Sequence, residues 1–307
     1  MDEAEVWRGG VNAWECDEMG HMNVRHHLAR ALEGLAGLAR RLRLPDAFRP
    51  DASSTLVVRE AHVRFLREAH AGAPLSMTGR VTRWGEADAE VALVMRHGDG
   101  APASTFLLRV EHATAAGAAF PWPRRASEAA QALLGPTPPE AVPRSLAFAD
   151  GPAVSASLAR AEALGLVCIS RGVLGPAGCD VHGFLRVDEF FGRVSDGAST
   201  LMRPVREAAS AGAPESRRVG GAVLEYRLLV LDRARAGDHL EIRSGLAAAE
   251  GKVSRVAHWM LDPESGRPWI TSEAVVVSFD LDTRKALPIG EAGLAALRPL
   301  LKAGLSL

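Results

Sequence analysis

Lysine is scarce in this chain of 307 residues: Lys252, Lys285 and Lys302 are its only lysines, and the other basic residues are arginines. The 36 basic residues are balanced by 37 acidic ones, which leaves a net charge of −1 at pH 7. A chain without excess positive charge has no general attraction for a polyanion or an anionic bilayer. We therefore expect neither a nucleic acid nor a membrane as its partner.

Long apolar runs and paired cysteines are also missing. No run approaches the roughly 20 residues that cross a bilayer, and the first residues are acidic where a secretory signal would be basic. The three cysteines, Cys16, Cys168 and Cys179, form neither an even disulfide set nor a Cys-x-x-Cys pair. We expect a cytoplasmic protein with reduced thiols and no metal centre. Its 47% hydrophobic and 24% charged composition is typical of a globular protein, and its length predicts two domains.

The chain contains a diverged repeat. A shift of 163 residues pairs Cys16 with Cys179, Asp17 with Asp180 and Gly20 with Gly183. A later block, at a shift of 165, pairs Glu60 with Glu225 and Gly72 with Gly237. So long a period predicts a duplicated domain whose copies pack as a pseudo-symmetric pair. The alternative is coincidence in a chain rich in Ala, Gly and Arg.

Prolines mark the boundary between the copies. They are dense between Ala118 and Pro143, where they interrupt sheet and helix alike. We predict an N-terminal domain over residues 1–125, a linker over 126–143 and a C-terminal domain over 144–307.

Each copy shows one helical pattern followed by strand patterns. In the first copy a helical recurrence of Ala, Gly and Leu over residues 23–44 precedes predicted strands at 55–68, 75–84, 90–97 and 104–114. The second copy repeats this with a helix at 185–201 and strands at 221–232, 239–247, 252–261 and 269–280. A helix at 154–164 and a strand at 166–174 precede it. An antiparallel sheet that buries one face against a central helix is the expected α+β unit.

The segment from Trp14 to Leu28 places Asp17, Gly20, His21 and Asn23 directly before the first long helix. This Asp-x-x-Gly-His-x-Asn motif resembles the hotdog-fold acyl-CoA thioesterases of the 4-hydroxybenzoyl-CoA thioesterase type. The strand and turn over residues 58–72 are similar to that family too. The resemblance covers about residues 4–115, with a weaker echo over 166–281. It implies two tandem hotdog domains packed as a pseudo-dimer, a double hotdog.

Thioester hydrolysis needs a base or nucleophile beside the carbonyl carbon and donors for the oxyanion. The thiolate leaves readily, because a cysteine-like thiol has a pKa of about 8.5, so a catalytic acid is not obligatory. The first turn of a helix offers free N–H groups and a positive dipole end. We therefore expect the oxyanion site around Gly20–Asn23.

The family resemblance makes Asp17 the catalytic base or nucleophile, without deciding between them. From the residues alone, Asp17 could instead cap the helix. His21 either orients the loop or transfers a proton. Asn23 either positions water or substrate, or caps the helix.

Five residues are predicted to bind substrate: Gly20, Met22 and His27 in the first copy, and Phe184 and Arg186 in the second. His26 and His27 do not share a helix face as an i, i+4 pair would, which argues against a metal site. His27 faces the substrate cleft or the partner copy, or else is a solvated surface residue.

The second copy departs from the motif. Phe184 stands at the position of His21 and Arg186 at that of Asn23, while Asp180 and Gly183 remain. Phe184 suits the lining of an acyl pocket. Arg186 could contact a phosphate of CoA or form a surface salt bridge. We predict one competent site, centred on Asp17, with the half that contains Asp180 as scaffold.

The sequence thus predicts a cytoplasmic thioesterase that cleaves a short-chain or aromatic acyl-CoA to free acid and CoA without a cofactor. Two alternatives stay open. One is a non-catalytic double-hotdog module that binds acyl-CoA, and the other is an enoyl-CoA hydratase or dehydratase. Association of pseudo-dimers into a homo-oligomer is open as well.

Overall fold

The computed structural model describes residues 4–148, 155–211 and 219–307. Its contacts divide the chain into two compact units. The first unit contains the residues up to Arg144 together with Ala177–Phe191, and the second contains Ser145–Pro176 with Gly192–Leu307. The short segment that opens the second long helix is therefore part of the first unit.

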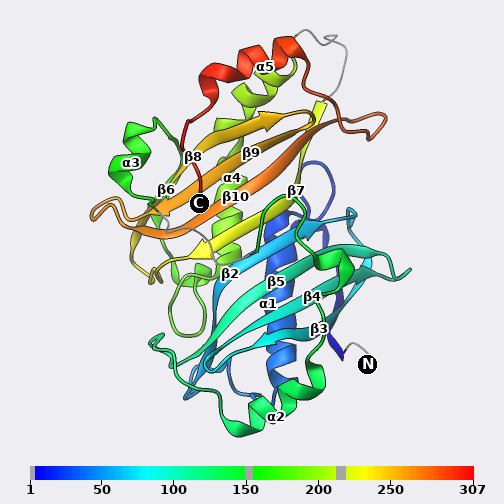
Figure 1. Cartoon of the computed structure of the whole chain (residues 1–307), viewed down its shortest axis with the longest axis vertical. Coiled ribbons are helices and arrows are strands. Elements are labelled where there is room, and N and C mark those ends of the chain that lie inside the picture. Colours follow the sequence, from blue (N-terminus) through cyan, green and yellow to red (C-terminus); the bar gives the residue numbers. More distant parts are fainter. Residues whose placement is uncertain (1–3, 149–154, 212–218) are drawn as a thin grey trace. The chain divides into compact units, whose positions relative to one another are not determined.

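The first unit is an antiparallel sheet with one long helix, α1 (Val24–Arg41), across one of its faces (Figure 1). The strands lie in the order β1-β3-β4-β5-β2, and each is antiparallel to its neighbours. Their bounds are β1 (Ala4–Gly10), β2 (Thr55–Phe65), β3 (Pro74–Trp84), β4 (Asp88–His97) and β5 (Pro102–Ala113). Shorter elements are η1 (Ala13–Glu15), α2 (Arg124–Leu133) and η2 (Pro139–Ala141).

The second unit repeats this arrangement with α4 (Val187–Ala209) as the long helix (Figure 1). Its strands lie in the order β7-β10-β9-β8-β6, again antiparallel. They are β6 (Val167–Val173), β7 (Val219–Val230), β8 (His239–Glu250), β9 (Val253–Leu261) and β10 (Pro268–Asp280). The remaining elements are α3 (Leu158–Ala163), η3 (Pro176–Gly178), α5 (Glu291–Leu297) and η4 (Arg298–Leu300). The predicted fold class, two tandem α+β hotdog domains, is confirmed.

Irregularities of the strands repeat at the same shifts as the sequence. The pairing of β1 skips Val6 and that of β6 skips Ile169, 163 residues later. The pairing of β2 skips Arg59 and that of β7 skips Leu224, 165 residues later. Because β-bulges mark specific bends of a strand, their recurrence at the two shifts supports a duplication over coincidence.

Glycine allows each long helix to approach its sheet closely. A side chain at Gly37 of α1 would overlap the backbone carbonyl of Val6, at the bulge of β1. A side chain at Gly197 of α4 would overlap the carbonyl of Ile169, at the bulge of β6. The Ala and Gly content of the helical pattern therefore reflects close packing of helix on sheet.

Two predicted helix bounds were wrong by four residues or more. The pattern predicted that the second long helix ends at residue 201, but α4 continues through Pro204 to Ala209. Leu201 and Val205 are buried while Pro204 is exposed, so the apolar stripe carries the helix past the proline. The helix predicted from residue 154 begins at Leu158, because the Ser157 side chain accepts the N–H of Arg160 and caps it there. Val154 lies outside the described residues.

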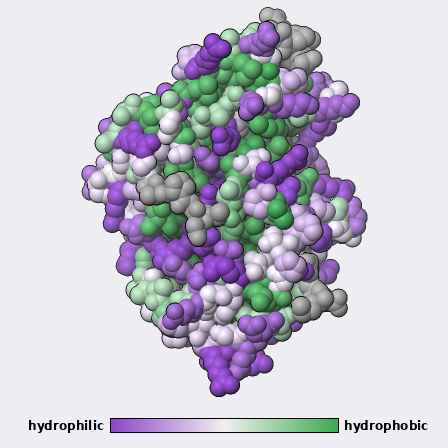
Figure 2. Space-filling view, viewed as in Figure 1, coloured by the Kyte–Doolittle hydropathy of each residue, from purple (hydrophilic) through white to green (hydrophobic). Residues whose placement is uncertain are grey.

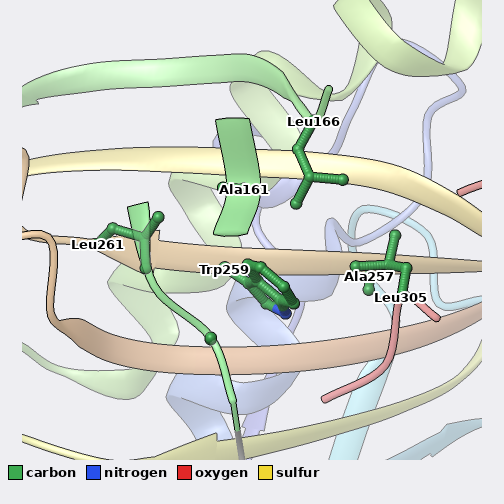
Figure 3. Close-up of a cluster of buried hydrophobic side chains, with 7 residues drawn as sticks. Ala161, Leu166, Ala257, Trp259, Leu261 and Leu305 are labelled. Carbon is green, nitrogen blue, oxygen red and sulfur yellow. The ribbon is translucent and has the colours of Figure 1, made fainter. Parts of the chain in front are cut away.

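The second sheet buries apolar side chains on its outer face as well. Trp259 of β9 packs there among apolar residues that include Ala161 of α3, Leu166 just before β6 and Leu305 of the C-terminal segment (Figure 3). Its indole N–H donates to the carbonyl of Ser306 at 3.0 Å. The C-terminal segment is thereby fixed to the sheet.

Hydrophilic and hydrophobic residues are interspersed over the face drawn in Figure 2. No helix in the described ranges is long and apolar enough to span a membrane.

Candidate active site

The motif loop is a narrow hairpin between η1 and α1. Cys16 and Met22 form an isolated antiparallel bridge, and the N–H of Asp17 donates to the carbonyl of His21 at 2.9 Å. The turn closes through a bond from the N–H of Gly20 to the carbonyl of Asp17, with Gly20 at φ +78°. This left-handed conformation favours glycine. The hairpin places the side chains of Asp17 and His21 side by side.

The imidazole of His21 lies between two carboxylates, one from its own loop and one from the residues after β2. Nδ1 of His21 lies 3.2 Å from Oδ2 of Asp17, and its Nε2 lies 3.6 Å from Oε1 of Glu68. The Asp17 and His21 side chains are 21% and 16% exposed, so both are shielded but still accessible. Glu68, which follows the end of β2, is not among the predicted site residues. His70, two residues further on, also contacts the motif loop, because it bonds the carbonyl of Gly20 through Nδ1 at 3.0 Å.

The surroundings of Asp17 favour its ionised form. Partial burial raises the pKa of Asp17, but the hydrogen bond and charge of His21, with backbone N–H groups of Met19 and His21, outweigh it and lower the pKa below its ordinary value. Asp17 is therefore a carboxylate at neutral pH. It is held by its own loop and does not cap α1, so the capping alternative was wrong for this residue.

Asn23 is the residue that caps α1. Its Oδ1 accepts the N–H of Arg25 at 2.9 Å, and its backbone lies in the extended region typical of an N-cap. Of the two roles left open for Asn23, capping is thus seen directly. A role toward water or substrate stays a prediction.

The hydrogen bonds of the loop reduce the number of backbone N–H groups that could donate to an oxyanion at the predicted site. The N–H groups of Gly20, Met22 and Asn23 are engaged, since they donate to the carbonyls of Asp17, Ala69 and Glu15. In the first turn of α1, Arg25 donates to the cap, and His26 and His27 donate to the carbonyl of Asn23. Among the described residues, the Val24 N–H alone in this turn has no acceptor, so it is the donor that the helix end offers.

His27 and Met22 are buried. His27 is 4% exposed, so it is not a solvated surface residue; its Nδ1 lies 3.0 Å from Oγ of Ser104, and its ring meets the edge of Phe65. Burial lowers the pKa of His27 to about 4, which keeps the ring neutral at pH 7. A role of His27, Met22 or Gly20 in substrate binding stays a prediction.

The second motif loop keeps the shape of the first without an imidazole at the position of His21. The N–H of Asp180 donates to the carbonyl of Phe184, and Gly183 has φ +80°. Oδ1 of Asp180 accepts the N–H groups of His182 and Phe184 at 2.9 and 3.0 Å. Asp180 therefore has a loop-forming role, while buried Phe184 occupies the position of the first loop's histidine.

Arg186 forms an ion pair at the start of α4. Its Nε and Nη2 lie 2.9 and 2.5 Å from the two oxygens of Asp188, whose side chain is 1% exposed. Arg25 of α1 pairs with the next residue, Glu189, and its Nη2 lies 2.7 Å from Oε2 of that side chain. Arg186 therefore forms a salt bridge, although with a buried carboxylate and not one at the surface, and contact with a phosphate stays a prediction.

The two glutamates at matching strand positions are structural. Glu60 is buried and pairs with Arg109 at 3.0 Å, whereas Glu225 accepts the N–H groups of Ser145 and Leu146 at 2.8 and 3.2 Å.

All three cysteines are free thiols. The described ranges contain no group of three or more His, Cys, Asp or Glu side chains that could hold a metal ion.

Comparisons with known proteins place this geometry in a family. No curated protein matches the sequence. Among solved structures, a protein from Lactobacillus plantarum named as an oleoyl thioesterase matches with a TM-score of 0.67 and 10% identity, over 91% of this chain and 98% of its own. The 12:0-ACP thioesterase from Umbellularia californica matches with a TM-score of 0.64 and 9% identity, over 89% and 96%.

An acyl-ACP thioesterase from Bacteroides thetaiotaomicron matches with a TM-score of 0.60 and 9% identity, over 88% of this chain and 96% of its own. At such low identity these likenesses concern the fold alone. The sequence itself matches the thioesterase-like superfamily twice, over residues 11–133 and 174–297. The two matches together span most of the chain, and the chain therefore belongs to the thioesterase-like superfamily.

Proposed function

We propose that this chain hydrolyses the thioester of a short-chain or aromatic acyl-CoA to the free acid and CoA, with Asp17 as the reacting carboxylate. The observation that carries the proposal is the contact of 3.2 Å between Asp17 and His21 in a partly exposed loop before α1. Membership of the thioesterase-like superfamily supports thioester hydrolysis in general.

The lowered pKa of Asp17 favours direct attack over general base catalysis. A general base works best when its pKa lies near the working pH, whereas a carboxylate nucleophile only has to be ionised. One oxygen of Asp17 attacks the thioester carbonyl carbon, the C–S bond breaks, and CoA leaves as the thiolate. Water then hydrolyses the resulting mixed anhydride, which releases the acid and regenerates the Asp17 carboxylate.

The remaining groups position the carboxylate and stabilise charge. His21 holds Asp17 through Nδ1 and is itself flanked by Glu68, so the ring fixes the orientation of the carboxylate. The Val24 N–H and the positive end of the α1 dipole are suited to the oxyanion of the tetrahedral intermediate. The second loop has Phe184 at the position of His21, and we assign this loop a structural role.

A second candidate differs in the carrier of the acyl group. Two solved structures of similar fold are named as acyl-ACP thioesterases, which favours an acyl-ACP as the alternative substrate. The chemistry at Asp17 would be the same, because both carriers present the acyl group as a thioester.

The test is the release of free thiol from matched panels of acyl-CoAs and acyl-ACPs by the wild type and by Asp17→Asn and Asp180→Asn. We expect Asp17→Asn to abolish release and Asp180→Asn, a matched change in the equivalent loop, to retain it. The panel with the higher kcat/KM identifies the carrier. Loss in Asp180→Asn alone would reverse the assignment of the loops. Saturable binding without thiol release, or hydration of crotonyl-CoA, would replace hydrolysis by one of the alternative functions.

A further inference from the structure

The second unit holds a partly open cavity of about 160 Å³ between α4 and the strands β7, β9 and β10. Its body is apolar. Ala198, Met202 and Val205 line it from α4, and Val276 and Val277 line it from β10. Ile289 closes one side just before α5, where its N–H donates to the carbonyl of Gly251 at 2.8 Å.

At two positions of the cavity wall the second copy has a smaller residue than the first. At a shift of 163, Ala198 corresponds to Leu35, and at a shift of 165, Gly221 corresponds to Leu56. Both leucines are buried in the first unit. A Cβ at Gly221 would meet only Arg206 Nη1 at 3.6 Å and the Val277 carbonyl at 3.9 Å, which are ordinary contacts. Close packing therefore does not require glycine here, unlike at Gly197.

The polar side chains of the cavity wall are cations or hydroxyl groups, and all of them can donate a hydrogen bond. Arg206 and Lys252 bring two positive charges, and Ser254 and Ser278 bring hydroxyl groups. No acidic residue lines the cavity, and within the described part of the chain neither cation has an ion-pair partner. An apolar body with a cationic, donor-rich wall is complementary to a small anion that carries an apolar tail.

We propose that this cavity binds a free monocarboxylate with a short aliphatic or aromatic tail, its carboxylate on Arg206 and Lys252. An apolar cavity of about 150 Å³ admits benzene, so this volume accommodates one ring or a chain of similar size. The choice of acid rests on the proposed function, because hydrolysis of a short-chain or aromatic thioester releases such an acid. The second unit would then retain the product of the reaction at a site of its own.

Calorimetric titration of the full chain with hexanoate, in the absence of thioester, tests the site independently of turnover. We expect saturable binding to the wild type that is weakened about tenfold or more in Arg206→Gln, which removes a charged hydrogen bond. Gly221→Leu, which restores the residue of the first copy, should weaken binding comparably by filling the cavity. Hexanamide, which is uncharged, should bind at least tenfold more weakly than hexanoate.

Two controls separate this site from the Asp17 loop. Arg203→Gln removes an exposed arginine of the same helix that does not line the cavity, and it should bind hexanoate as the wild type does. Asp17→Asn should also bind normally; if it abolishes thiol release while hexanoate binding persists, both proposals stand. Binding with no thiol release by the wild type would leave this site standing and refute the proposed function. Absence of hexanoate binding, equal binding of hexanamide, or full binding by a folded Gly221→Leu variant would overturn the cavity proposal.

Discussion

Nδ1 of His21 lies 3.2 Å from Oδ2 of Asp17, across a hairpin that a glycine turn closes. The same position in the second loop is held by Phe184, whose backbone bonds Asp180 but whose ring offers no hydrogen bond to it. The chain therefore contains two equivalent hairpins that differ at this position, one with histidine and one with phenylalanine.

Replacing His21 by phenylalanine should impair hydrolysis and change its pH dependence. Loss of one charged hydrogen bond predicts a decrease of kcat/KM by about tenfold or more at neutral pH. Because His21 lowers the pKa of Asp17, its removal raises that pKa. The reaction needs the ionised carboxylate, so activity falls as the pH drops through this pKa, and the acid limb of the kcat/KM profile should move to higher pH. The control His239→Phe changes an exposed histidine of the second unit. An unmoved acid limb in His21→Phe would contradict the pairing.

The fold was predictable because periodicity and duplication are local or repetitive signals. The two shifts were visible in glycines and aspartates, and they reappear as bulges at Val6 and Ile169. The end of α4 was not predictable from Pro204, since the buried positions of Leu201 and Val205 on the folded sheet override the proline.

The site was predictable only where its parts are adjacent in sequence. Asp17, His21 and Asn23 lie within one loop, so the motif could be recognised from their spacing in the sequence. Glu68 comes 47 residues after His21, and only the folded sheet brings the two side chains to 3.6 Å. The capping role of Asn23 became visible only through one bond from the N–H of Arg25, which residue type alone does not reveal.

The two glycines of α1 should differ in their tolerance of alanine. Gly37→Ala would place a methyl group against the backbone carbonyl of Val6, which is difficult to move, whereas Gly34→Ala meets the flexible end of the Met77 side chain. Overpacking costs about 1–3 kcal/mol, more than the roughly 1 kcal/mol that alanine gains over glycine in a helix. We expect Gly37→Ala to lower the free energy of unfolding in urea, and Gly34→Ala to change it less. Equal stabilities would contradict the close approach of α1 to β1.

Glu241 should contribute stability that depends on pH. It is buried on β8 and pairs with Arg171 at 2.6 Å and with Arg243. Burial raises the pKa of Glu241, but the hydrogen bonds and charges of the two arginines outweigh it, so the folded-state pKa lies below the ordinary value of 4.5. A lowered acid pKa stabilises the fold above the unfolded value, and this stabilisation is lost as the pH falls through the folded one.

Glu241→Gln should therefore lower the free energy of unfolding at pH 7 by about 1–2 kcal/mol, a range reduced for the exposure of Arg171. The difference from the wild type should begin to shrink below about pH 4.5, where the carboxylate of the unfolded chain takes up its proton, and should vanish only below the lower folded-state pKa. Urea unfolding at several pH values measures this difference. Glu250→Gln, at the exposed end of the same strand, is the matched control. A difference that persists unchanged at low pH would refute an electrostatic origin.

Alanine at the two loop glycines should separate stability from activity. Gly20 and Gly183 have φ of +78° and +80°, and a Cβ at either position would meet no heavy atom within 4 Å. The cost of alanine is therefore backbone strain alone, about 1 kcal/mol for a left-handed residue, and should be similar at both sites. Only Gly20→Ala shifts the hairpin that carries Asp17, so only this variant should lower kcat/KM for thiol release. Unfolding in urea gives the first comparison and steady-state kinetics the second. If Gly183→Ala lost activity as strongly as Gly20→Ala while both stayed folded, the assignment of a single competent loop would fail, since strain in the Asp180 hairpin would then reach the reacting group.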